Sequence, residues 1–276
     1  MSGLSERALL ELVLTGAVCG ALGVQVVLRR LAFFTETFGH ITFLGIVAAT
    51  ITGTDIKLGA GLAAMCAVAV TSRHGIASRR NHQHAGVMVS GALALGVVLI
   101  SARPGFSKDL TAALVGSPLT AGTGDIAMAT VVAALVAGAL TLGHKELALA
   151  AFDPGATRAL GYRTRLIDSG LLALLAITVM TAAPAVGAAL PLALLIGPAA
   201  SALLWTRRIL PATLLGGLLG AASGAAGLAV SLHYRVATAA GTAVICGALF
   251  ALAAATSTLT ADQRRACPSP APATSL

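Results

Sequence analysis

The chain has 276 residues, of which 57% are hydrophobic and only 10% are charged. Its mean hydropathy is +0.91, and soluble domains carry about 25% charged residues. This composition excludes a soluble globular protein and predicts an all-α, polytopic membrane protein. The net charge of +8 is accounted for by membrane orientation, so no nucleic-acid partner is expected.

Apolar windows of about 20 residues, long enough to cross about 30 Å of hydrocarbon as a helix, recur along the chain. Charged or Pro/Gly-containing segments separate them. Together they predict one transmembrane domain over residues 1–262, followed by a Pro-containing tail over 263–276 that is expected to be disordered and cytoplasmic. The nine expected spans are 8–28, 31–52, 56–72, 85–102, 126–143, 166–183, 188–206, 211–232 and 239–259.

The lysines and arginines predict the orientation, because cytoplasmic loops are enriched in them. An N-terminus outside the cell places most of the 18 basic residues on the cytoplasmic side. Only Arg7, Lys57, Arg103, Lys108 and Arg235 then fall on the opposite side. We therefore expect a multi-pass protein of the plasma or inner membrane, with its C-terminus in the cytoplasm and contacts to membrane lipid.

The first and eighth expected spans carry glycines at intervals of four residues. These are Gly16 and Gly20 in the first span, and Gly216, Gly220 and Gly224 in the eighth. Helices in lipid associate through close backbone approach at small residues. The spacing therefore predicts tight helix packing at these positions.

The second expected span contains an acid and a histidine and follows a pair of arginines, Arg29 and Arg30. Glu36 and His40 lie four residues apart, which on a helix places their Cβ atoms on one face, about 5–6 Å apart. A carboxylate in hydrocarbon is costly, so an intramembrane ionisable pair points to function. We predict that Glu36 and His40 are a functional pair that can share a metal cation. The alternative is that Glu36 pairs with Arg29 or Arg30 at the membrane surface.

The longest expected cytoplasmic loop, residues 143–165, contains a candidate docking helix. An aspartate followed by proline is typical of a helix start, and a glycine is typical of a helix end. A short capped helix in such a loop favours docking to a partner over a flexible linker. The predicted docking residues are Phe152, Asp153, Pro154, Ala156, Ala159, Leu160 and Gly161.

Two prolines, Pro191 and Pro198, fall within the seventh expected span. Proline breaks or kinks a helix, and broken helices often lie beside translocation paths. The prolines therefore predict either a role beside the path or structural bending alone.

Three further histidines, His74, His82 and His84, fall in the expected cytoplasmic loop after the third span. Imidazoles close in sequence can hold a metal, but Arg79 and Arg80 beside them disfavour a cation. We therefore expect solvated loop residues here, and a metal site remains the alternative.

No motif supports chemistry within this chain. A phosphate-binding loop needs lysine directly after glycine, and none of Lys57, Lys108 and Lys145 follows one. The HExxH and GxSxG motifs of hydrolases are also absent from the sequence. We expect no enzyme, so ATP-driven transport would need a separate ATPase chain.

With these residues in view, the chain resembles the permease subunits of zinc- and manganese-type ABC importers over nearly its whole length. Two departures are that Glu36 replaces the usual aspartate, and that Arg235, Ala237 and Ala239 replace an Asp-x-Pro-x-Gly-like stretch. The resemblance rests on Arg29, Arg30, Phe33, Phe34, Glu36, His40 and Gly45; on Leu114, Gly116, Leu119 and Asp125; on Lys145, Glu146, Phe152, Asp153, Ala156, Ala159 and Gly161; and on Val186, Gly187, Leu194, Leu195, Pro198, Ala199 and Ala200.

The resemblance implies a type II ABC importer-like permease fold with about nine transmembrane helices. It also implies a complex with a second permease copy, identical or not, two cytoplasmic ATPase subunits and an extracytoplasmic metal-binding protein. The cytoplasmic coupling helix would fall within residues 152–161. No permanently bound cofactor is implied, and the cargo would be a divalent metal, zinc or manganese.

Two other transport classes remain open on the sequence. A secondary transporter driven by an ion gradient would use Glu36 and His40 as a relay, but it gains nothing from a docking helix. A siderophore-type ABC permease shares the docking helix, but it usually has a longer chain and no intramembrane ligand pair. Imidazole and carboxylate suit zinc, manganese and iron, so the residues leave the metal open.

Overall fold

A computed structural model describes residues 2–74, 79–101, 122–187, 191–206, 208–234 and 236–266. These residues form helices and short connections, with no strand among them, as the composition predicts. The helices are α1 (Ser2–Leu28), α2 (Ala32–Thr52), α3 (Ile56–His74), α4 (Arg79–Ser101), α6 (Thr123–Leu142), α7 (His144–Phe152), α8 (Pro154–Ala159), α9 (Thr164–Val186), α10 (Pro191–Trp205), α11 (Ile209–Tyr234) and α12 (Thr238–Ala266).

Each of the nine expected membrane spans is matched by a helix in the described residues. Within the described ranges, six helices are long and apolar enough to cross a membrane: α1, α2, α6, α9, α11 and α12. Three shorter apolar helices, over Ile56–Ser72, Ala85–Ser101 and Pro191–Trp205, account for the other expected spans. The chain is therefore an all-helical, multi-pass membrane protein with about nine spans. Helix α12 continues to Ala266, and residues 267–276 of the expected tail lie outside the described residues.

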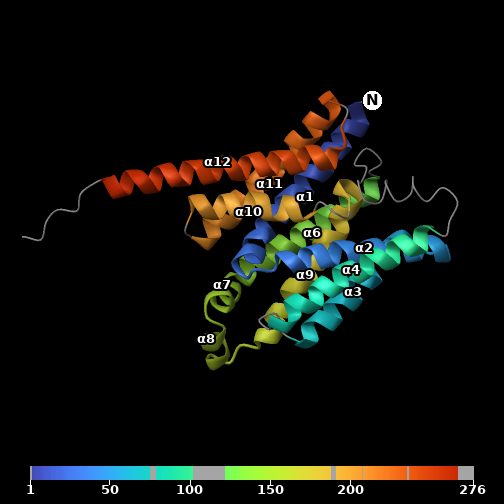
Figure 1. Ribbon diagram of the computed structural model, residues 1–276, viewed down its shortest axis with the longest axis horizontal. Coiled ribbons are helices and arrows are strands. Elements are labelled where there is room, and N and C mark those ends of the chain that lie inside the picture. The colour runs from blue at the N-terminus through green and yellow to red at the C-terminus, as the bar shows by residue number, and fades with distance from the viewer. Residues whose placement is uncertain are drawn as a thin grey trace, which may run out of the picture.

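The long helices pack in two groups (Figure 1). One group contains α1, α10, α11 and α12, and the other contains α2, α3, α4 and α9. Helix α1 contacts both α6 and α9, and thereby joins the groups. The short helices α7 and α8 project together from one end of the molecule. We call this the α8 end.

The α1–α11 contact is made by glycine backbones, as their spacing predicts. A Cβ atom built on Gly216 would lie 2.6 Å from the carbonyl oxygen of Gly20. Cβ atoms built on Gly16, Gly20 and Gly220 would also collide with the backbone of the facing helix. One turn further on, a Cβ atom on Gly224 would lie 2.5 Å from the carbonyl oxygen of Leu12. The two helices are therefore as close as their backbones allow.

Replacing Gly20 with Val should push α1 away from α11 and destabilise the protein. Overpacking of this kind costs about 1–3 kcal/mol, and we expect the melting temperature in detergent to fall by roughly 5 °C. Thermal unfolding followed by size-exclusion chromatography measures the change. The matched control is Gly138→Val, because a Cβ atom on Gly138 meets no atom within 4 Å. Equal melting temperatures for the two variants would contradict the close glycine contact.

Candidate functional site

Helices α1 and α2 meet at a tight corner formed by residues 29–31. Arg30 has φ +58°, in the left-handed region that glycine usually occupies at a helix end. The Leu31 N–H donates to the Val26 carbonyl oxygen (2.8 Å), and the Arg30 N–H donates to the Val27 carbonyl oxygen (3.1 Å). This pairing is the Schellman motif. It fixes the direction in which α2 leaves α1.

The predicted pair Glu36 and His40 lies one to two turns into α2. His40 Nε2 and Glu36 Oε1 are 3.0 Å apart, which confirms that the two side chains share a face of the helix. The His40 side chain is 9% exposed and the Glu36 side chain is 28% exposed. The carboxylate therefore reaches the surface of this chain, and the imidazole lies behind it.

The pair offers a metal one carboxylate and one imidazole. The Nδ1 atom of His40 is buried and has no hydrogen-bond partner within the described part of the chain. Among these residues no group of three or more His, Cys, Asp or Glu side chains is arranged to hold a metal. Closed structural zinc sites use four protein ligands. Two ligands from one chain suit an ion that binds briefly and leaves.

The predicted docking helix is present as α8, and its cap has the expected chemistry. The Asp153 carboxylate accepts hydrogen bonds from the N–H groups of Gly155 and Ala156, both at 2.9 Å. Pro154 is in the first turn, and Gly161, after the helix, has φ +83°. The sequence signals for the start and end of this helix are therefore local and correct.

Apolar side chains are exposed at both ends of α8. Phe152, the last residue of α7, is 71% exposed, and Leu160, directly after α8, is 67% exposed. Ala159 is exposed and Ala156 is partly exposed. Thr157 is fully buried, and its hydroxyl donates to the Asp153 carbonyl oxygen at 2.7 Å. Exposed apolar groups on a fixed helix are typical of a protein-docking surface.

The segment before α8 differs from the expectation. The sequence predicts one short helix in an otherwise irregular loop over residues 143–165, but residues 144–152 form a second helix, α7. Its sequence, HKELALAAF, is rich in the helix formers Leu, Ala, Glu and Lys. The charged Lys145 and Glu146 end the apolar span and so indicate a loop, although both residue types also favour a helix.

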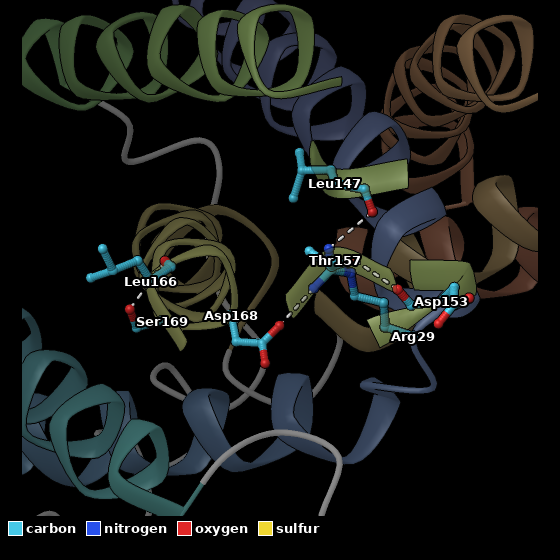
Figure 2. Close-up of polar contacts among 7 residues, drawn as sticks. All are labelled: Arg29, Leu147, Asp153, Thr157, Leu166, Asp168 and Ser169. Carbon is cyan, nitrogen blue, oxygen red and sulfur yellow. Dashed lines mark hydrogen bonds and ion pairs between the residues drawn. The ribbon is translucent and has the colours of Figure 1, made fainter. Parts of the chain in front are cut away.

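Arg29 joins three elements at the α8 end (Figure 2). Its Nη1 atom lies 2.9 Å from Asp168 Oδ1 of α9, and its Nη2 atom donates to the Leu147 carbonyl oxygen of α7 at 3.0 Å. The Arg29 side chain is only 5% exposed. Burial lowers the pKa of its guanidinium, and the Asp168 carboxylate opposes that shift. The alternative pairing of Arg29 with Glu36 is therefore wrong.

A second ion pair lies at the end opposite α8. Lys57 Nζ, at the start of α3, is 2.8 Å from Asp125 Oδ1, at the start of α6. Asp125 also accepts a hydrogen bond from the Gly122 N–H at 2.9 Å. This carboxylate therefore holds two helix starts together.

The other predicted residues fall in several places. Pro191 begins α10, where its missing N–H costs little, and Pro198 lies buried inside that helix. Ala237 is exposed, and Ala239 is buried near the start of α12. The side chains of His74, His82 and His84, together with Arg235, Leu114, Gly116 and Leu119, lie outside the described part of the chain.

The chain is similar to known proteins over most of its length. The model of the ABC 3 transport family matches residues 2–257. The chain is 31% identical over 252 residues to the manganese transport system membrane protein MntC of Halalkalibacterium halodurans, covering 90% of this chain and 85% of that protein. It is 28% identical over 234 residues to the chelated iron transport system membrane protein YfeD of Yersinia pestis, covering 84% of this chain and 78% of that protein. The structure of PsaBC from Streptococcus pneumoniae in complex with Fab matches with a TM-score of 0.80 and 26% identity, over 90% of both chains.

Removing the Asp153 cap should loosen α8 without affecting the spans. Replacing an aspartate N-cap with alanine costs about 1 kcal/mol of helix stability. We therefore expect the Ala156 and Thr157 amides of Asp153→Ala to exchange hydrogen roughly fivefold faster, as measured by mass spectrometry. Asp153→Asn is the matched control, since asparagine caps equally well, and its exchange should stay close to that of the unmodified protein. Equal exchange in all three proteins would mean that the cap does not stabilise α8.

Proposed function

Because the chain belongs to the ABC 3 transport family, we propose that it is the permease subunit of an ATP-driven importer of a divalent metal, with manganese as the favoured cargo. The manganese assignment is supported by the name of the MntC relative. The observation that carries the proposal is the Glu36–His40 pair, a partly exposed carboxylate against a buried imidazole within a membrane-spanning helix.

The chemistry of the pair suits a permeation site. A carboxylate oxygen and an imidazole nitrogen bind manganese, iron and zinc, whereas thiolates would favour softer ions. Conduction requires binding that is strong enough to admit the ion and weak enough to release it. Two ligands meet that need, and water or a second permease copy can complete the coordination. The Glu36–His40 hydrogen bond would open to accept the metal.

We place the energy source in a separate ATPase that binds the α8 end. The chain has no phosphate-binding loop, so in this proposal it is not itself an enzyme. Phe152 and Leu160 present exposed apolar area next to the charged Arg158 and Arg163. Apolar anchors surrounded by a polar rim are typical of a helix that enters a groove on its partner.

The complete complex would contain two permease copies, two ATPase subunits and an extracytoplasmic protein that delivers the metal. The α8 end would face the cytoplasm and the N-terminus would lie outside, as the lysine and arginine positions favour. The Lys57–Asp125 pair would then lie at the outer end. In this arrangement the metal would enter at the outer end and leave towards the ATPase subunits.

Iron is the second candidate cargo, because YfeD belongs to a chelated iron system. Zinc is the third, since the same ligands accept it. Uptake of radiolabelled manganese into proteoliposomes, in competition with unlabelled iron and zinc, ranks the three metals. Uptake that needs no ATPase would instead favour a secondary transporter.

Removing both ligands should stop transport but not assembly. In Glu36→Gln/His40→Ala we expect manganese uptake to fall at least tenfold, because the path loses its only carboxylate–imidazole pair on α2. Assembly with the ATPase and ATP hydrolysis should remain measurable. The matched control, Glu6→Gln/His233→Ala, changes the same groups at exposed positions and should transport normally. Wild-type uptake in the first variant would reduce the pair to a structural role.

Truncating the exposed aromatic at the α8 end should release the ATPase. A buried aromatic anchor commonly contributes about 2 kcal/mol or more, so Phe152→Ala should weaken binding roughly thirtyfold. Affinity between purified ATPase and permease in nanodiscs measures the effect. The matched truncation Phe250→Ala in α12 and the rim change Arg163→Ala should do little. Unchanged ATPase affinity in Phe152→Ala would show that this surface is not the docking site.

A further inference from the structure

The Arg29 guanidinium connects the α1–α2 corner to two other elements at once. It lies 2.9 Å from the Asp168 carboxylate and 3.0 Å from the Leu147 carbonyl oxygen, to which it donates (Figure 2). A planar guanidinium can donate in two directions at once from one rigid group, whereas a lysine ammonium is a point charge on a flexible stem. Its 5% side-chain exposure leaves little freedom to move away from either acceptor.

The contact between Arg29 and Leu147 connects the α1–α2 corner to the docking surface, which we define as the exposed apolar residues Phe152 and Leu160 at the α8 end. Leu147 is a buried residue of α7, which ends at Phe152, and the next residue, Asp153, caps the start of α8. Thr157 of α8 is buried and bonds back to the Asp153 carbonyl oxygen. Only Asp153 separates α7 from α8, and the two helices contact each other. Because Phe152 is the last residue of α7, a displacement of Phe152 or of α8 is expected to move α7.

The α1–α2 corner also connects Arg29 to the proposed metal ligands, Glu36 and His40. Two backbone hydrogen bonds and the left-handed Arg30 fix residues 29–31, and Leu31 is fully buried. Glu36 follows Leu31 by five residues, about 7.5 Å along a helix at 1.5 Å per residue. A shift of Arg29 is therefore a shift of the start of α2.

Asp168 supplies the third connection. It lies in α9, which packs against α1, α2 and α3. The ion pair thus ties the corner to a helix of the transmembrane core, in addition to the α7 contact. Without Asp168, Arg29 would still bind α7 but would lose its bond to α9.

We propose that Arg29 is a positioning residue that transmits movement of the α8 end to helix α2, and so couples ATPase action to the Glu36–His40 pair. The proposal rests on the proposed function and adds the route by which the docking surface reaches the site. Arg29 touches neither metal nor ATPase in this scheme. It acts by holding Leu147, Asp168 and the corner in one fixed arrangement.

A merely structural role makes a different prediction. If Arg29 only supported the fold, its loss would lower assembly, ATP hydrolysis and metal uptake together. A coupling role predicts that hydrolysis continues while fewer ions cross per ATP. The quantity that separates the two roles is the ratio of manganese transported to ATP hydrolysed.

The test uses the complete complex in proteoliposomes, with manganese-loaded binding protein outside and ATP on the α8 side. Arg29→Gln removes the positive charge, and Asp168→Asn removes the carboxylate that pairs with it. Arg29→Lys keeps the charge but loses the rigid group that donates in two directions. We expect Arg29→Gln to lower the transport ratio at least tenfold, with hydrolysis within twofold of the unmodified complex. Asp168→Asn should act in the same direction, and Arg29→Lys should be intermediate. The control Arg208→Gln changes an exposed arginine between α10 and α11 and should leave the ratio unchanged.

The outcomes separate this inference from the proposed function. An unmodified complex without ATP-dependent manganese uptake would overturn the proposed function. If the unmodified complex takes up manganese normally, an unchanged ratio of manganese transported to ATP hydrolysed in Arg29→Gln and Asp168→Asn would overturn the coupling role alone. Loss of assembly in all three variants would assign Arg29 to the fold and would also overturn the coupling role. A lowered ratio of manganese transported to ATP hydrolysed in any variant that assembles, with a normal ratio in Arg208→Gln, would support the coupling role.

Discussion

The glycine contact between α1 and α11 is the constraint on which much of the structure depends. In lipid, helices gain little from the hydrophobic effect when they associate, so they depend on close packing. Gly16, Gly20, Gly216 and Gly220 bring the two backbones into direct contact. This contact holds α1 in place along its length. The corner at its end, and with it the start of α2, is positioned from a fixed helix.

Two of the ion pairs described above join separate parts of the chain. The Lys57–Asp125 pair joins α3 to α6, and Arg29 joins the corner to α9. Glu36 and His40 differ, because they pair within one helix and the partner of the carboxylate is an imidazole and not a lysine or arginine. Ionisable groups in a membrane are costly unless they pair or serve a function. A carboxylate and an imidazole are both metal ligands, which is why our proposal assigns the cargo to this pair.

Features with local signals could be predicted from the sequence, and features with distant partners could not. The spans, the glycine spacing, the Glu36–His40 pair and the Asp153 cap each depend on residues within a few positions of one another. Arg29 and Asp168 are 139 positions apart, and nothing in either neighbourhood indicates the other. The sequence therefore indicates Arg29 as an orientation charge or as a partner of Glu36, but not as a partner of Asp168. Helix α7 is not predicted for a different reason, because its charged first turn resembles the end of a span.

The α1–α11 contact also limits how the protein can change shape. Packed helices usually slide past one another by small shear movements, in which side chains keep their rotamers or shift slightly. At the glycines there are no side chains to accommodate such sliding, and the carbonyl groups of one helix abut the backbone of the other. We therefore expect α1 and α11 to move together as one unit. A hinge that opens the path during a transport cycle is then expected elsewhere in the bundle.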